Sequence, residues 1–431
     1  MQKFHRSLLF VLLLFVNLSC KKESNTNSDN YLPIVVVHGY IGSGDSYEWM
    51  SKRFTSNGYP KEKIFAFDWN TLTNGAESDT RGLEKFIQYV LLKTGASKVN
   101  LVGHSLGGAL SFNYCKKPAN AANVAHLALI APYLVSHTSL PDSTIPTLNI
   151  WPNTDYVVSN GDSLPEAVNL LLINKDHNEA VACNETFSAI YKLFTGNDPA
   201  TLDVSNEAAP VLSGRAVSFV ENIPSAGAKV EVYRVDPTSG FRISAAPDLT
   251  FTADVNGYWG PMTADPSAYY EFKVFTGKPG DRPLHFYREP FTHSDQLVYL
   301  RTYPPNTSIL SFALGVIPKN NNQAVSIFFS GSKALWQDRD DLKINGISMT
   351  NVTFMKRELN TLAIFLYDSN NNKISDVTSV PLFDVVQSLK GADFYFPTLL
   401  PESITFEFNG RILRTRNWPS STEGVSVALY E

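Results

Sequence analysis

The sequence predicts an α/β region with a mostly parallel sheet, followed by a C-terminal region built from β-strands alone. Residues 31–203 alternate short continuous apolar runs with amphipathic helical patterns, as expected for strands buried on both faces of a sheet. After residue 203 the apolar residues alternate singly with polar ones, and turn residues separate the runs. That pattern is typical of antiparallel sandwiches and barrels.

The first region contains five apolar runs that predict strands, and a sixth, PEAVNLLLI, precedes His177. Between them, apolar residues from Leu83 to Leu91 follow the spacing of one helix face, and Gly95 ends that helix. A second helix is predicted from Phe187 to Phe194, before Gly196. The five runs are LPIVVVHGY, KIFAFDW, KVNLVGHS, VAHLALIAP and IPTLNIW.

The C-terminal region shows alternation in DLTFTADV, YEFKV and SITFEFNGRIL, the last with a hairpin signal at Asn409-Gly410. The turn-rich stretch RTYPPNTS predicts a boundary between two β domains, 204–303 and 304–431, which follow the α/β domain at 31–203. One larger barrel is the alternative. We expect the aromatic residues of this region in its core rather than on a binding platform, and DRDD at 338–341 in a solvated turn; the aromatics concerned are Tyr258, Trp259 and Trp336.

The N-terminus has the pattern of an export signal. A charged segment precedes the apolar run Leu8–Val16, and small residues precede Cys20. We expect residues 1–20 to be a lipoprotein-type signal peptide, Cys20 the lipid anchor to a membrane, and residues 21–30 a tether. The protein would then be an outer-membrane or cell-surface lipoprotein. Plain secretion with cleavage near Ser19 and a cytoplasmic location are the alternatives.

Composition restricts the partners. The formal net charge of −5 gives no basic face for nucleic acid. No spacing typical of metal ligands occurs, so neither a metal nor another cofactor is predicted, and no obligate protein partner is evident. Only Cys115 and Cys183 follow Cys20, so no disulfide framework is predicted. Both are expected to be buried free thiols, and a disulfide between the two in an exported protein is the alternative.

One sequence motif indicates a catalytic serine. The residues Gly103-His104-Ser105-Leu106-Gly107 follow a predicted strand and open a small-residue helix, which is the setting of the G-x-S-x-G nucleophile elbow. A serine hydroxyl needs a base to remove its proton, an acid to orient that base, and N–H donors for the oxyanion. In α/β-hydrolases the acid and then the histidine follow the serine along the chain.

His177 and Asp155 occupy the expected places. His177 lies in a loop before the last helix of the α/β region, and Asp155 directly follows a strand. The two later histidines, His285 and His293, fall in the β region. Three other carboxylates are less well placed, because they precede the strand, lie further from its end, or adjoin His177; they are Asp142, Asp162 and Asp176.

The oxyanion donors are predicted to be the backbone N–H groups of Leu106 and Tyr40. His38 is expected to brace the loop that carries Tyr40, and His104 to be a packing or rim group. Three glycines, Gly39, Gly103 and Gly107, let the backbone segments approach closely.

These motifs resemble a known family. Residues 31–195, with HG, GHSLGG, NTD and DH, resemble the small secreted bacterial lipases of minimal α/β-hydrolase fold. The stretches SGRAVSFVENIPSAGAKVEVYRVDPTSGFR and HFYREPFTHSDQLVYLRT, within 205–303, resemble the C-terminal β region of an archaeal long-chain lipase. The resemblance implies lipase or carboxylesterase activity on a lipid or ester substrate, with Ser105, Asp155 and His177 as the triad. No insertion long enough for a helical lid is present, so we expect an open groove over Ser105.

Two other functions stay open. A thioesterase or polyester depolymerase would use the same triad with different pockets. A non-catalytic surface protein that binds lipid or glycan through its β domains is the third hypothesis.

Overall fold

The computed structural model describes residues 31–72, 76–159, 161–305, 308, 311, 314–315 and 317–431. The predicted signal peptide, the tether and Cys20 therefore lie outside the described residues. No helix within the described ranges is both long and apolar enough to cross a membrane.

The N-terminal region is built on a six-stranded sheet in the order β2-β1-β3-β4-β5-β6, and every neighbouring pair is parallel. Each strand coincides with an apolar run of the sequence, so the predicted parallel sheet is confirmed. The strands are β1 (Ile34–Val37), β2 (Ile64–Phe67), β3 (Val99–His104), β4 (Val124–Ile130), β5 (Thr147–Pro152) and β6 (Val168–Leu172).

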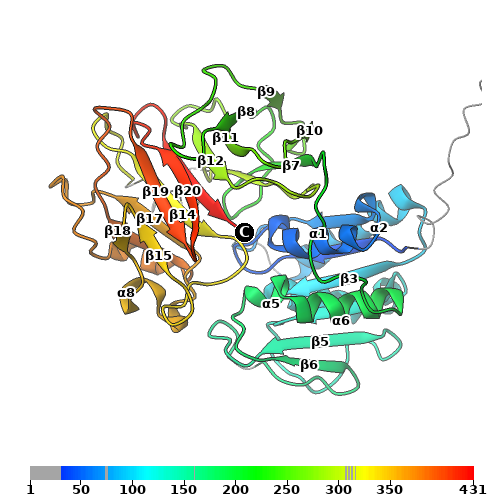
Figure 1. Ribbon diagram of the computed structural model, residues 1–431. Helices are drawn as coiled ribbons and strands as arrows, with labels where there is room; N and C mark the ends of the chain where they lie inside the picture. Colours follow the sequence, from blue (N-terminus) through cyan, green and yellow to red (C-terminus); the bar gives the residue numbers. More distant parts are fainter. Residues whose placement is uncertain are drawn as a thin grey trace, which may run out of the picture.

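Helices cover both faces of this sheet (Figure 1). Buried side chains of α1 (Glu48–Ser56) and α6 (Asn184–Thr195) pack with one face, and those of α2 (Ala76–Thr94) and α3 (Leu106–Cys115) with the other. The two helices predicted from periodicity are α2 and α6. The shorter helices are η2 (Gly44–Tyr47), η3 (Lys61–Lys63), α4 (Pro118–Ala121) and α5 (Glu179–Ala182).

The described residues of the C-terminal region form three sheets. The largest has eight strands in the order β18-β17-β14-β21-β12-β11-β8-β9; the others are β10-β7-β13 and β16-β15-β19-β20. The strands are β7 (Val211–Ser218), β8 (Lys229–Val235), β9 (Leu249–Thr252), β10 (Tyr258–Thr263), β11 (Tyr269–Phe275), β12 (Leu284–Arg288), β13 (Leu300–Thr302), β14 (Val325–Ser330), β15 (Leu342–Ile344), β16 (Ile347–Ser348), β17 (Ala363–Tyr367), β18 (Leu389–Asp393), β19 (Ser403–Phe408), β20 (Arg411–Arg416) and β21 (Val425–Tyr430). Short helices α8 (Val352–Met355), η4 (Arg357–Leu359) and η5 (Pro381–Val385) connect some of them.

The pairing in this region is mixed rather than antiparallel throughout. β21 lies between β12 and β14 and is parallel to both, and β17 is parallel to β18. Single alternation of apolar residues identifies a half-buried strand but not its direction. Because β12 pairs with β21, the eight-stranded sheet also crosses the limit predicted between residues 303 and 304; as a domain boundary, that limit stays a prediction.

Several single-residue expectations can be compared with the structure. Trp259 and Trp336 are buried, whereas Tyr258 is half exposed. Cys115 and Cys183 are buried and free, as predicted, and burial raises the pKa of both thiols. The solvated turn expected at 338–341 is wrong for Asp340, which is buried and bonded to Lys333 and Arg339.

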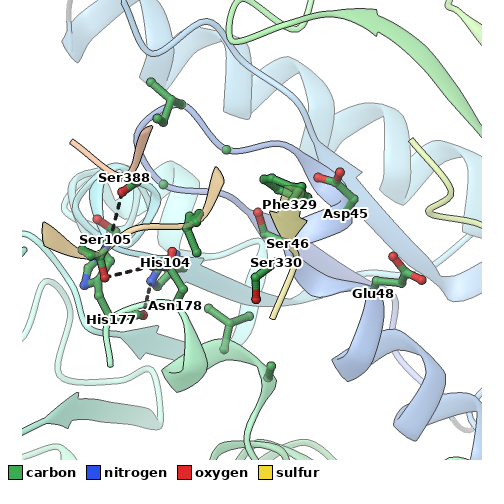
Figure 2. A pocket seen from close by; sticks show the side chains of 18 of the residues that line it. Asp45, Ser46, Glu48, His104, Ser105, His177, Asn178, Phe329, Ser330 and Ser388 are labelled. Atoms are coloured by element: carbon green, nitrogen blue, oxygen red, sulfur yellow. Dashed lines mark hydrogen bonds between the residues drawn. The ribbon is translucent and has the colours of Figure 1, made fainter. Parts of the chain in front are cut away.

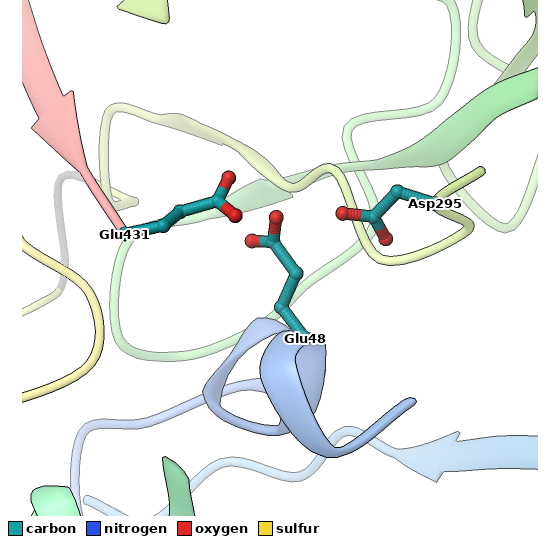
Figure 3. Close-up of side chains that lie close together, drawn as sticks. All are labelled: Glu48, Asp295 and Glu431. Atoms are coloured by element: carbon teal, nitrogen blue, oxygen red, sulfur yellow. The ribbon is translucent and has the colours of Figure 1, made fainter. Parts of the chain in front are cut away.

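A buried ionic cluster joins α1 to the β region near the C-terminus (Figure 1, Figure 3). Glu48, Asp295 and Glu431 point toward one another, and one carboxylate oxygen of each lies within 4.8 Å of those of the other two. Lys52 and Arg288 form ion pairs with Glu48 and Glu431. Burial alone would raise the pKa of Glu48, but Arg288 and Lys52 lower it to about 2, whereas burial and Glu48 raise the pKa of Asp295. Lys52 and Arg288 thus balance the charges of Glu48 and Glu431, and the cluster joins the two regions.

Candidate active site

Ser105 sits in a sharp turn between β3 and α3. Its φ of 55° and ψ of −121° lie where side-chain-bearing residues are strained, as the nucleophile elbow requires. The Ser105 N–H donates to the Ile130 carbonyl at 2.9 Å, which fixes the turn to β4. A Cβ at Gly107 would lie 2.3 Å from the carbonyl oxygens of Val37 and His38, so glycine is needed for the helix to approach β1.

The His177 ring is paired with Asp155. Its Nδ1 lies 2.7 Å from Asp155 Oδ2, and both side chains are buried. Asp155 Oδ1 accepts the backbone N–H groups of Val157 and Val158, both at 2.8 Å, so the turn after β5 fixes the carboxylate. Since Nδ1 faces Asp155, Nε2 is the ring nitrogen left for a reacting group. His177 and Ser105 line the same pocket (Figure 2).

The competing carboxylates lie elsewhere. Asp142 bonds to Thr144, and the exposed Asp162 bonds to the N–H of Ser163. The Asp176 carboxylate accepts N–H groups from Asn178, Glu179 and Ala334 and pairs with Arg339. Of the four carboxylates considered, Asp155 is the one that bonds to the His177 ring. Of the later histidines, His285 bonds to Glu271. His293 bonds to Thr55 and to Ser205.

His104 supports the histidine loop. Its Nε2 donates to the His177 carbonyl oxygen at 3.0 Å, and the two ring centroids are 4.6 Å apart (Figure 2). Burial, followed by the nearby His177, lowers the pKa of His104 well below its usual value. His104 is therefore a neutral packing residue and not part of an exposed rim.

The loop after β1 carries Tyr40 into the same pocket. The Gly39 carbonyl oxygen accepts from His38 Nδ1 at 2.8 Å and from the Gly42 N–H at 3.2 Å. The Gly39–Tyr40 peptide is trans, so the Tyr40 N–H points away from these bonds. Among the described residues, no acceptor is bonded to it. Leu106 begins α3, where backbone N–H groups lack partners within the helix.

The C-terminal region forms one wall of this pocket, and the open groove over Ser105 stays a prediction. Ser105 is only 5% exposed. Asn178, next to His177, donates to Asn360, which donates to Ser388. Sequence reasoning missed these wall residues because strand alternation looks the same for a pocket wall as for a core. They are Phe329, Ser330, Gly331, Asn360, Leu362, Gln387, Ser388, Leu389, Leu429 and Glu431.

A second, largely apolar cavity adjoins the first. The two share Phe219, Phe329, Leu389 and Leu429 in their walls, together with the ion pair of Asp45 and Arg301. The second cavity runs along the eight-stranded sheet of the β region. Its other apolar lining residues are Leu284, Phe286, Tyr299, Tyr303, Leu314, Ile317, Ile327, Ala363, Phe365, Val425 and Val427.

Comparison with known protein families finds matches in both the N-terminal and the C-terminal region. A family model for lipase (class 2) matches residues 31–122, one for the lipase C-terminal domain matches 209–305, and a third, for a C-terminal domain, matches 319–431. Similar solved structures include Bacillus licheniformis lipase BlEst2 (18% identity; 38% of this chain and 93% of that chain covered; TM-score 0.32). Another is a CIB-like hydrolase from Thermoplasma acidophilum (18% identity; 38% of this chain and 84% of that chain covered; TM-score 0.29). A third is a bacterial membrane phospholipase A (14% identity; 39% of this chain and 80% of that chain covered; TM-score 0.32). A class 2 lipase match in the first region and a lipase C-terminal match after it support an α/β-hydrolase lipase.

Proposed function

We propose that the protein hydrolyses carboxylic esters of acyl chains, such as acylglycerols, with Ser105 as nucleophile, His177 as base and Asp155 as the orienting acid. The observation that carries this proposal is the 2.7 Å contact between His177 Nδ1 and Asp155 in the pocket that also holds the strained Ser105. The match of residues 31–122 to the class 2 lipase model supports ester hydrolysis as the reaction.

The reaction would proceed in two halves. Ser105 Oγ attacks the ester carbonyl carbon while its proton passes to His177 Nε2, and Asp155 stabilises the resulting imidazolium. The Tyr40 and Leu106 N–H groups bind the oxyanion. As the tetrahedral intermediate collapses, the alcohol leaves with the proton from His177, and an acyl-enzyme remains. Water, deprotonated by His177, then attacks the acyl carbon and releases the acid with Ser105 restored.

The adjoining apolar cavity supports acyl chains as the substrate class. A fatty-acyl chain is stabilised by burial at about 0.8 kcal/mol for each methylene. The cavity begins at Phe329 and Leu389, which also line the pocket of Ser105, so a chain bonded to Ser105 would have an apolar path into it. This favours chain-like acyl esters over polymer substrates, while thioesters of the same acids would fit the same path.

A substrate panel tests the proposal. Wild-type protein and Ser105→Ala would be assayed on p-nitrophenyl esters from butyrate to palmitate, on an acyl thioester and on an aliphatic polyester. We expect ester cleavage by wild type and loss of nearly all of it in Ser105→Ala, with unchanged folding by circular dichroism. Ser46→Ala, which alters another serine of the same pocket, is the control and should keep its activity.

Several outcomes of the substrate panel would contradict the proposal. Ester cleavage by Ser105→Ala at the wild-type rate would exclude the assigned nucleophile. Faster turnover of the thioester or the polyester than of every ester would favour one of the alternative hydrolases, and the absence of all three activities would favour a binding protein. Mass spectrometry after treatment with an alkyl phosphonate should find the adduct on Ser105.

A further inference from the structure

A buried turn of the β region reaches the loop that carries Tyr40. The turn Phe219–Asn222 follows β7, and Val220, Glu221 and Asn222 are all buried. Val220 and Asn222 both have positive φ, 74° and 57°. A β-branched residue rarely adopts that conformation, so its surroundings impose it. Bonds from the Phe219 N–H to Thr302 and from the Asn222 N–H to Ser218 hold the turn in place.

The Asn222 side chain contacts three acceptors in the α/β region. Its Nδ2 lies 2.8 Å from the Gly42 carbonyl oxygen, 3.1 Å from the Trp69 carbonyl oxygen and 3.2 Å from His38 Nε2. Gly42 lies at the end of the Tyr40 loop, and His38 at its start. One amide group thus joins both ends of that loop to the segment after β2.

These bonds fix the state of His38. Its Nε2 accepts from Asn222 and from the Trp69 N–H at 3.2 Å, so the ring proton must lie on Nδ1. Nδ1 then donates to the Gly39 carbonyl oxygen at 2.8 Å. Burial lowers the pKa of His38, which is consistent with a neutral ring. Because the Gly39–Tyr40 peptide is trans and its carbonyl oxygen is held toward the His38 ring, the Tyr40 N–H points away from that ring.

We propose that Asn222 is a positioning residue for the oxyanion site: through His38 and Gly42 it holds the loop in the orientation that directs the Tyr40 N–H at the reacting carbonyl. The inference rests on the proposed function. Asn222 itself does not line the pocket of Ser105. The β region would therefore supply part of the catalytic geometry as well as a wall of the pocket.

Two variants test this role. Asn222→Gly removes the amide, and glycine adopts positive φ without strain. Asn222→Asp keeps the shape but removes the N–H donor. We expect kcat for p-nitrophenyl butyrate to fall by about 10- to 100-fold in both, because a small misplacement of an oxyanion donor has effects of that size. KM should stay within about twofold, since the substrate's ground state gains little from the oxyanion donors.

A second readout separates positioning from a general loss of structure. A long-chain alkyl trifluoromethyl ketone forms a tetrahedral adduct with the serine, and its inhibition constant should rise by the same factor as kcat falls. The control is Asn345→Gly, an exposed asparagine that also has positive φ, 49°, and lies in a turn of the β region. Rates are compared per folded molecule, measured by circular dichroism.

The outcomes distinguish the two proposals. If Ser105→Ala is inactive while both Asn222 variants keep the wild-type kcat or inhibition constant, only the role of Asn222 is overturned. A change in KM without a change in kcat would also overturn it. If Ser105→Ala remains as active as wild type, the proposed function fails, and this inference fails with it.

Discussion

Arg339 of the C-terminal region holds the carboxylate of Asp176, the residue before His177. Its Nη1 and Nη2 lie 3.2 and 3.3 Å from Asp176 Oδ2, and Nη1 also lies 2.7 Å from Glu179. The Ala334 N–H donates to the same Asp176 oxygen at 3.1 Å. Asp176 is only 2% exposed, so this carboxylate depends on these partners. The loop of His177 is therefore fixed by a segment more than 150 residues away in the chain.

Arg339→Ala should weaken both stability and catalysis. Removing one partner of a buried ion pair costs about 3 kcal/mol, and a loosened His177 should lower kcat by about tenfold. Urea unfolding and p-nitrophenyl butyrate assays measure the two effects. Arg357→Ala is the matched control, because Arg357 stacks on the same Trp336 ring but pairs with the exposed Asp338. Equal effects of the two substitutions would show that the contact with Asp176 is not important.

Asp155→Asn should lower kcat by about 10²- to 10⁴-fold, less than Ser105→Ala or His177→Ala, because the acid only orients and stabilises the imidazolium. Asp162→Asn is the control: that carboxylate is exposed and bonds to its own turn, so its loss should leave kcat within about twofold. A larger loss of kcat in Asp162→Asn than in Asp155→Asn would show that the assigned acid is wrong.

The parts of the site that follow local sequence patterns could be predicted. Ser105 lies in a short motif after a strand, and Asp155 and His177 follow strand ends in the order that the fold requires. The parallel sheet places these strand ends at one edge, so chain order was enough to bring the residues together.

The contributions of the β region could not be predicted in this way. Asn222 reaches His38 across 184 residues, and Arg339 reaches Asp176 across 163. Asn222 lies in a stretch that resembles a lipase C-terminal region, but no pattern in that stretch indicates a contact with His38. Arg339 lies in a charged run that is typical of a solvated turn. The buried state of Asp340 and the wall over Ser105 also depend on how the sheets pack, which single alternation of apolar residues does not specify.

Ala363→Leu should shorten the acyl chains that the enzyme accepts. Ala363 is 3% exposed and lines the apolar cavity away from Ser105, so a larger side chain would occupy space for the chain. We expect kcat/KM for p-nitrophenyl palmitate to fall by about tenfold, while the value for the butyrate changes less than twofold. The short ester is the internal control. A parallel fall for both esters would indicate that the substitution disturbs the protein and that the cavity does not hold the chain.

Cys20→Ser should release the protein from the membrane if the export hypothesis is correct. An acyl chain on Cys20 would bury methylenes at about 0.8 kcal/mol each, and the serine variant has no thiol to modify. Cell fractionation with immunoblotting gives the distribution, and Ser24→Ala, in the same polar segment, is the control. The same distribution for Cys20→Ser and wild type would favour plain secretion.

Glu271 should contribute to stability down to low pH. This fully buried carboxylate lies 2.6 Å from His285 Nδ1 and 2.8 Å from Arg242 Nε. Burial alone would raise its pKa, but Arg242 and His285 outweigh burial and lower the pKa from the usual 4.5 to about 2. A carboxyl group with a lowered folded-state pKa stabilises the protein above its unfolded pKa, and that stabilisation is lost as the pH falls from about 4.5 toward 2.

The shift corresponds to about 3 kcal/mol of unfolding free energy over this pH range. Glu271→Gln should therefore lower the free energy of unfolding above pH 5 and flatten its dependence on pH between 5 and 2. Some dependence should remain, because His285 and Lys273 lower the pKa of Glu423 to about 2 as well, against the effect of its burial. Urea unfolding at several pH values measures the slope, with the exposed Glu185→Gln as control. A slope in Glu271→Gln equal to that of wild type would contradict the assignment, since it would mean that Glu271 titrates alike in the folded and unfolded protein.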